Sequence, residues 1–96
     1  HFVDEIVKYF DHNIPSLFKR RKDIDIAYSI IELMKRRREI ENFNKKALYI
    51  LIREMTGSKT QHITRIVNVM KKYNIQLMTE FRNRGQIDRT KVLHSS

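Results

Sequence analysis

The segment from Gly57 to Thr60 has the residue types of a phosphate-binding loop. Such a loop needs a glycine, four further residues and then Gly-Lys-Ser/Thr, so that backbone N–H groups surround the phosphates and the lysine reaches the terminal one. Here Ser58 separates Gly57 from Lys59. Counting back from Gly57 or from Lys59 places the first glycine at Ile52 or Arg53, inside a predicted helix. The spacing therefore excludes this kind of nucleotide chemistry.

The same turn has the pattern of a helix-turn-helix. That motif needs a glycine at the turn and apolar residues that lock two helices at a steep angle. Gly57 supplies the glycine, and Ile52, Ile63 and Ile66 occupy the locking positions. With these residues buried, the other face of the second helix is polar, and it carries Lys59, Thr60, Gln61, Thr64, Arg65 and Asn68.

These polar side chains suit the edges of DNA bases. An arginine such as Arg65 can make a bidentate contact to guanine, and Gln61 or Asn68 can do the same to adenine. Lysines nearby, at Lys59, Lys71 and Lys72, are placed to contact phosphates, which supply most of the affinity for DNA. The segment therefore predicts sequence-specific binding of double-stranded DNA.

Composition indicates one small, mostly helical domain. The chain has 96 residues, of which 41% are hydrophobic, with only 2 Gly and 1 Pro. So few turn-forming residues favour helices over a sandwich of many short strands. The 20 Lys and Arg outnumber the 11 Asp and Glu and give a formal charge of +9, which points to a polyanionic partner.

Nothing in the chain predicts an enzyme, a metal site or a cofactor. Cysteine is absent, which excludes disulfides and thiolate ligands. The histidines are scattered, without the spacing or acidic companion of a zinc site, and His62 is expected to be an ordinary surface residue. No segment reads as a signal peptide or a membrane span. We expect a cytoplasmic or nucleoid-associated protein, or a nuclear one in a eukaryote.

Apolar spacing predicts several helices before the turn. One begins near Val3 and ends near Asn13, and Pro15 suits the first position of a short second helix. Asp23 or Asp25 is expected to cap a third. Its buried face is Ile26, Ala27, Ile30, Ile31, Leu33 and Met34.

Residues 40–43 favour a short strand, and Asn44 is expected to cap the next helix, Lys45 to Met55. The buried stripe of that helix is Ala47, Leu48, Leu51, Ile52 and Met55. Gly57 permits a left-handed residue at the turn, and Ser58 or Thr60 is expected to cap the helix that follows.

Two interpretations of the C-terminal third stay open. In the first, Asn74 ends the recognition helix, and a β-hairpin follows with strands over 76–81 and 86–93 and a turn at 82–85. In the second, one apolar stripe continues through a single long helix without a hairpin. That stripe would be Ile63, Ile66, Val67, Met70, Tyr73, Leu77, Met78 and Phe81. We favour the hairpin.

With a hairpin, the chain resembles winged-helix domains of the MarR type. ITRIVNVMKKYNIQ, from Ile63 to Gln76, is similar to the recognition helix and exit of that family, and DRTKVL, from Asp88 to Leu93, resembles the start of its second wing strand. The resemblance covers about residues 26–93 and implies a dimeric DNA-binding transcription regulator. It implies helix contacts from Thr60, Gln61, Thr64 and Arg65 and wing contacts from Arg82, Arg84 and Arg89.

The favoured fold class is thus mainly α, a winged helix-turn-helix with extra N-terminal helices, and the alternative is an all-α fold with one long C-terminal helix. Residues 1–22 would form a helical extension and residues 23–96 the winged domain, packed as one unit. Two other functions fit the same charge. The chain could be an interaction module that docks on a polymerase or replication complex, or an RNA binder.

Overall fold

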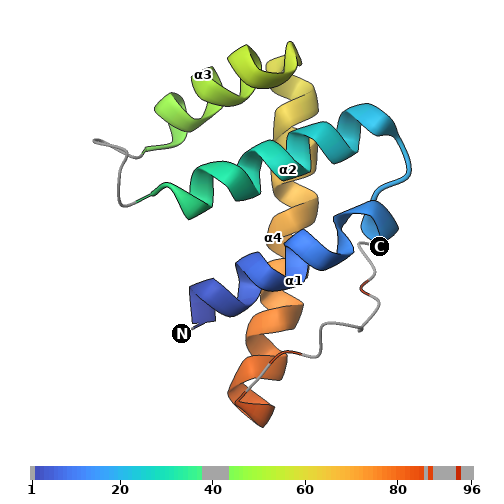
Figure 1. Cartoon of the computed structure of the whole chain (residues 1–96), viewed down its shortest axis with the longest axis vertical. Helices are drawn as coiled ribbons and strands as arrows, with labels where there is room; N and C mark the ends of the chain where they lie inside the picture. The colour runs from blue at the N-terminus through green and yellow to red at the C-terminus, as the bar shows by residue number, and fades with distance from the viewer. Residues whose placement is uncertain (1, 38–43, 86, 88–92, 94–96) are drawn as a thin grey trace.

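The computed structural model describes residues 2–37, 44–85, 87 and 93, and these contain four helices (Figure 1). The helices are α1 (Phe2–Leu17), α2 (Arg21–Lys35), α3 (Lys45–Thr56) and α4 (Thr60–Arg84). The first three lie across the molecule in one layer, with α1 and α3 on either side of α2, while α4 runs behind them along the long axis. All three contact α4. The predicted strand over residues 40–43 lies outside the described residues.

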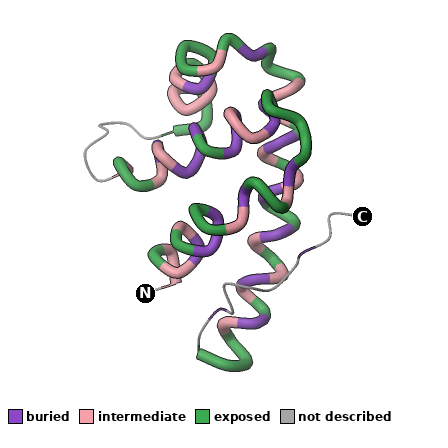
Figure 2. Tube along the Cα trace, turned by 45° about the vertical axis from the view of Figure 1, so that its right-hand side comes forward, coloured by how far each residue is buried: buried purple, intermediate pink, exposed green. Residues whose placement is uncertain are grey.

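The core lies between this layer and α4, where buried residues line the facing sides of the helices (Figure 2). The side chains that are almost completely buried are Tyr9, Ile14, Ile26, Ile31, Ile52, Ile63, Ile66 and Leu77. The stripes predicted for α2 and α4 are therefore confirmed as core-facing. Ile87 and Leu93, after α4, are buried in the same cluster.

The prediction that the first helix ends near Asn13 is wrong, because α1 continues through Pro15 to Leu17. Proline is costly inside a helix because it lacks an N–H group and crowds the preceding turn. Pro15 stands in the last turn of α1, however, and Phe10, Ile14 and Phe18 extend the buried stripe beyond it. Burial of this stripe favours one helix over two.

The predicted caps of α2 and α4 are also wrong. Helix α2 begins at Arg21, so Asp23 lies inside its first turn, and neither α2 nor α4 has a side-chain cap. The Ser58 hydroxyl accepts a hydrogen bond from Thr56 Oγ1 at 2.9 Å instead of capping α4. The cap of α3 is confirmed, since Asn44 Oδ1 accepts from the Ala47 N–H at 2.9 Å. Met55, expected in the stripe of α3, is half exposed.

The predicted β-hairpin is wrong, and the all-α alternative describes the chain. Helix α4 is one helix of 25 residues that includes the first predicted strand, and it ends at Gly85, whose φ is 71°. Of the second predicted strand, residues 86–93, only Ile87 and Leu93 are described, and neither lies in a strand. The winged helix-turn-helix is therefore not the fold of this chain.

Helix α1 explains why α4 continues. The Tyr73 ring lies 6.5 Å from the Phe10 ring and 6.2 Å from the Phe18 ring, and further along α4 the Phe81 ring lies 5.2 Å from the Phe2 ring. The N-terminal segment thus covers the apolar stripe of the second half of α4. A hairpin would break that stripe, because strand residues alternate between two faces.

Candidate nucleic-acid interface

The left-handed turn at Gly57 and the burial of the three isoleucines around it are confirmed. Gly57 has a φ of 68° and its N–H donates to the Arg53 carbonyl at 2.8 Å, which ends α3. Ile63 and Ile66, one turn apart on α4, are completely buried, as is Ile52 of α3. After the turn, the chain leaves the layer of α1 to α3 and runs along the long axis (Figure 1). These residues occupy the locking positions that the sequence predicted.

Opposite its buried stripe, α4 has a continuous exposed face, which we call the outer face. Its residues, at spacings of three or four, are Gln61, Arg65, Asn68, Lys72, Ile75, Thr79 and Arg82. The charged members are all cations, and the only carboxylate of α4, that of Glu80, is buried. Because α1, α2 and α3 all lie on the other side of α4, they leave this face uncovered.

One buried carboxylate, that of Asp23, links α2 to the start of α4. Its Oδ1 accepts hydrogen bonds from His62 Nε2 at 2.6 Å and from Arg65 Nη2 at 2.7 Å. Burial by itself raises the pKa of Asp23, but the two hydrogen bonds and the positive charge of Arg65 outweigh it. The pKa of this carboxyl group therefore lies below its ordinary value, and it stays ionised at neutral pH.

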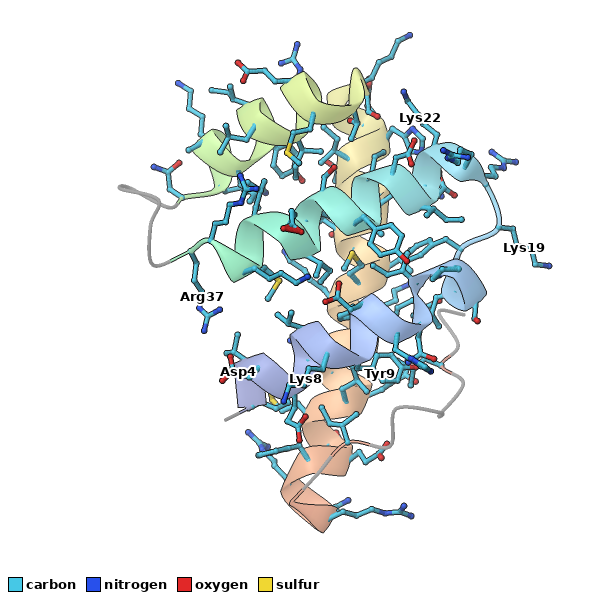
Figure 3. The ribbon with its side chains drawn as sticks, viewed as in Figure 1. Asp4, Lys8, Tyr9, Lys19, Lys22 and Arg37 are labelled. Atoms are coloured by element: carbon cyan, nitrogen blue, oxygen red, sulfur yellow. The ribbon has the colours of Figure 1, made fainter. Side chains whose placement is uncertain are left out.

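Lys22, the residue before Asp23 in α2, contacts the turn between α3 and α4 from the α3 side. Lys22 Nζ donates to the Thr56 carbonyl at the end of α3. Lys22 projects from the start of α2, at the opposite end of that helix from Arg37 (Figure 3). The first turn of α2 thus holds both the end of α3 and the start of α4. Arg65 is oriented by this arrangement while its side chain remains 51% exposed.

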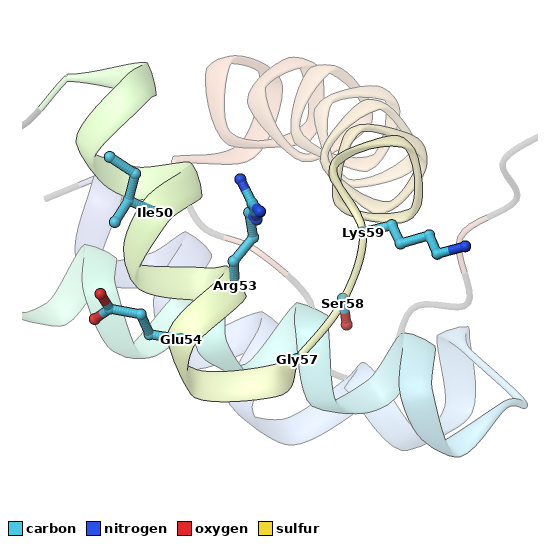
Figure 4. Close-up of a pocket in the computed structure, with 6 residues that line it drawn as sticks. All are labelled: Ile50, Arg53, Glu54, Gly57, Ser58 and Lys59. Carbon is cyan, nitrogen blue, oxygen red and sulfur yellow. The ribbon is translucent and has the colours of Figure 1, made fainter.

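A hollow of ≈ 640 Å³ lies between α3 and the first turns of α4. It is lined by Lys45, Lys46, Tyr49, Ile50 and Arg53 of α3 and by Thr60 and Thr64 of α4. Arg53 extends from α3 towards the first turn of α4, whereas Lys59 points away on the other side of α4 (Figure 4). The lining therefore combines three cations of α3 with two hydroxyl groups from the first turns of α4.

The residues predicted to bind DNA are not all on one surface. Thr60 and Thr64 line the hollow, and Gln61, Arg65, Asn68 and Lys72 share the outer face. Lys71 instead lines a different, mostly apolar hollow together with residues of α1 and α2.

Two of the arginines that were predicted to lie in a wing lie in α4 instead. Arg82 and Arg84 lie in the last turn of α4, about 30 Å along the helix from Gln61 at 1.5 Å per residue, and not at the tip of a wing. Arg89 is outside the described residues.

Sequence reasoning missed two groups of residues. The cations of α3 could have been assigned to one surface from the sequence, because Lys46, Tyr49, Ile50 and Arg53 follow the i, i+3, i+4, i+7 spacing of one helix face. The pairing of His62 with Asp23 had no local signal, since 39 residues separate them. His62 is half-buried and hydrogen-bonded rather than an ordinary surface histidine.

Comparison of the chain with protein-family models, with curated proteins and with solved structures finds no match. Within the part of the chain that the structure describes, no three His, Asp or Glu side chains gather as metal ligands would. None of the helices in residues 2–37 and 44–85 is long and apolar enough to cross a membrane.

Proposed function

We propose that this protein binds double-stranded DNA, with the first half of α4 in the major groove. The observation that carries the proposal is the outer face of α4, which is basic, free of carboxylates and uncovered by the other three helices. The major groove is about 12 Å wide and accepts an α-helix with its side chains. An uncovered helix face of this charge therefore matches both the shape and the potential of the groove.

The first half of α4 carries the groups that suit base edges. Gln61 and Asn68 are exposed amides, and Arg65 between them is oriented by Asp23. Recognition helices of helix-turn-helix proteins contact bases with their N-terminal residues. The cations further along the outer face, Lys72 and Arg82, would contact phosphates, which strengthens binding without selecting sequence. Regulation of transcription would follow from such binding if the protein prefers particular sites.

The proposal is tested by fluorescence-anisotropy titration against a random-sequence DNA duplex, a matched single strand and an RNA duplex, at about 50 and 200 mM salt. We expect the DNA duplex to bind best and, for about four phosphate contacts, to lose about 100-fold in affinity between the two salts. Better binding to the single strand or to the RNA duplex contradicts the proposal and supports an RNA binder. Absence of binding at low salt also contradicts it and points to a protein partner.

A matched pair of variants tests whether DNA binds to the outer face of α4. Asn68→Glu puts a negative charge at an exposed position of the outer face, and it should weaken duplex binding at least about 10-fold. His12→Glu makes the same change in charge on the exposed side of α1, which lies on the other side of α4, and should change affinity far less. Equal losses in the two variants would show that the outer face is not where DNA binds.

A further inference from the structure

The hollow between α3 and α4 has a lining that suits phosphate groups. Lys45, Lys46 and Arg53 contribute cations and Thr60 and Thr64 contribute hydroxyl groups, and among the described residues no carboxylate lines it. An adjoining hollow shares Arg53 and includes Glu54, but Glu54 points away from Arg53 (Figure 4). The described lining of the first hollow therefore has a net positive charge.

Several of these side chains are held in place before any ligand arrives. The Tyr49 hydroxyl lies 3.0 Å from Thr64 Oγ1, a hydrogen bond that joins α3 to α4 across the hollow. Lys45 Nζ lies 5.8 Å from the centre of the Tyr49 ring, a cation–π contact. The cations come from one helix, which fixes the spacing of their backbone positions, and binding to an ordered site costs less entropy than binding to flexible loops.

The hollow is continuous with the outer face of α4. Thr60 precedes Gln61 in the chain, and Thr64 lies one helical turn before Asn68, so the α4 wall of the hollow borders the outer face. A helix that occupies the major groove has one phosphate backbone on each side. The backbone on the α3 side would then pass across the hollow.

We propose that this hollow binds the phosphate backbone of duplex DNA, on one side of the groove that α4 occupies. The inference rests on the proposed function and extends it, because it assigns contacts to α3. The hollow would give the protein a contact beside the groove that does not depend on a wing, since α4 continues as a helix where the wing was predicted to begin.

The test is the double variant Lys45→Glu/Lys46→Glu, assayed by the same titration against a random-sequence DNA duplex over a range of salt concentrations. Both positions are exposed in the first turn of α3, which contains no acidic residue. Glutamates at a helix N-terminus interact favourably with the helix dipole, so the variant should keep its fold, as circular dichroism would verify. Because each phosphate contact strengthens binding, we expect at least about a 10-fold loss of affinity. The slope of log affinity against log salt concentration should fall by the amount expected for about two phosphate contacts.

The control is Lys8→Glu/Lys19→Glu, which changes the net charge by the same amount at exposed positions of α1 and the α1–α2 loop. It should leave the salt dependence unchanged. Equal losses in both double variants, with the wild type still binding, overturn the inference and leave the proposed function intact. A wild type that does not bind the duplex overturns the proposed function itself and the inference with it.

Arg53→Gln gives a second, milder check at the other end of the hollow. Arg53 is exposed, so the change should cost little stability while removing one phosphate contact. We expect the salt dependence to fall by about one contact. An unchanged salt dependence in this variant and in Lys45→Glu/Lys46→Glu also overturns the inference.

Discussion

The Asp23 carboxylate stabilises the junction between α2 and α4 because it is buried and twice hydrogen-bonded. Its two partners differ in exposure, with the Arg65 side chain 51% exposed and that of His62 27% exposed. Exposed ion pairs contribute little to the free energy of unfolding. When the charged acceptor is itself buried, removing its partners or its charge destabilises the protein more. Much of the stabilising effect should therefore depend on the charge of Asp23.

At the residue scale we predict that Asp23→Asn lowers the free energy of unfolding by about 1–2 kcal/mol at pH 7, since a neutral amide replaces the ionised acceptor of both hydrogen bonds. The pKa of Asp23 is below its ordinary value of 3.8, so this stabilisation is complete well above that pH. It is lost as the pH falls through 3.8 towards the folded-state pKa. Urea denaturation of both proteins from about pH 7 to about pH 2 should show the difference shrink with acidification.

Asp25→Asn is the matched control for that measurement. Asp25 pairs with Arg21 at 3.5 Å, and both side chains are substantially exposed, so its loss should cost no more than about 0.5 kcal/mol. A wild-type-like stability of Asp23→Asn at pH 7, or a loss that is the same at every pH, would contradict the role assigned to this carboxylate.

At the element scale, the decisive feature is that α4 stays helical beyond Asn74. Asparagine is a weak helix former and often ends helices, but here it stands in the middle of α4. The buried side chains on both sides of it, Tyr73 and Leu77, contact the core. The free energy of burying them exceeds the modest propensity cost of one asparagine.

Ile75→Pro tests this continuity. Ile75 is 64% exposed, so the variant loses little core packing, but proline in a helix interior should cost about 3 kcal/mol or more. Ile75→Ala, which keeps the N–H group, should be close to neutral. Urea denaturation compares the three proteins. A loss below about 1 kcal/mol for the proline variant would mean that the helix ends before this position.

At the scale of the whole molecule, α1 and α4 share one core. The ring contact of Phe10 with Tyr73 joins α1 to α4, and that of Phe18, the residue after α1, adds to it. The ion pair between Lys35 and Asp11, at 2.7 Å, joins α1 to α2. An extension over residues 1–22 and a domain over residues 23–96 were predicted from the sequence to pack as one unit, which stays a prediction. Contacts of this kind favour a single cooperative transition.

We therefore expect Ile14→Ala, a change at a completely buried position of α1, to destabilise the whole protein by about 2–5 kcal/mol. Hydrogen exchange should show the slowest amides of α2 and α4 losing protection by the same amount as those of α1. Ser16→Ala, at an exposed position of the same helix, should have no such effect. Unchanged protection in α4 would show that α1 is a separate extension.

The sequence by itself determined the local features of this protein. The stripes of α2 and of the first half of α4, the Asn44 cap and the left-handed turn at Gly57 follow from spacing and side-chain chemistry within a few residues. The excess of positive charge is likewise a property of composition. Contacts within one helical turn are enough to specify such features.

Only the tertiary structure decided between the hairpin and the long helix, because α1 covers the stripe of α4 after Asn74, where the Phe2 ring packs against the Phe81 ring. It also decided that Pro15 is tolerated and that Asp23, expected to cap a helix, joins His62 and Arg65. These outcomes depend on side chains far apart in the chain, whose burial outweighs local propensity. For the same reason none of α1, α2 and α3 covers the outer face of α4, since all three pack on its opposite side.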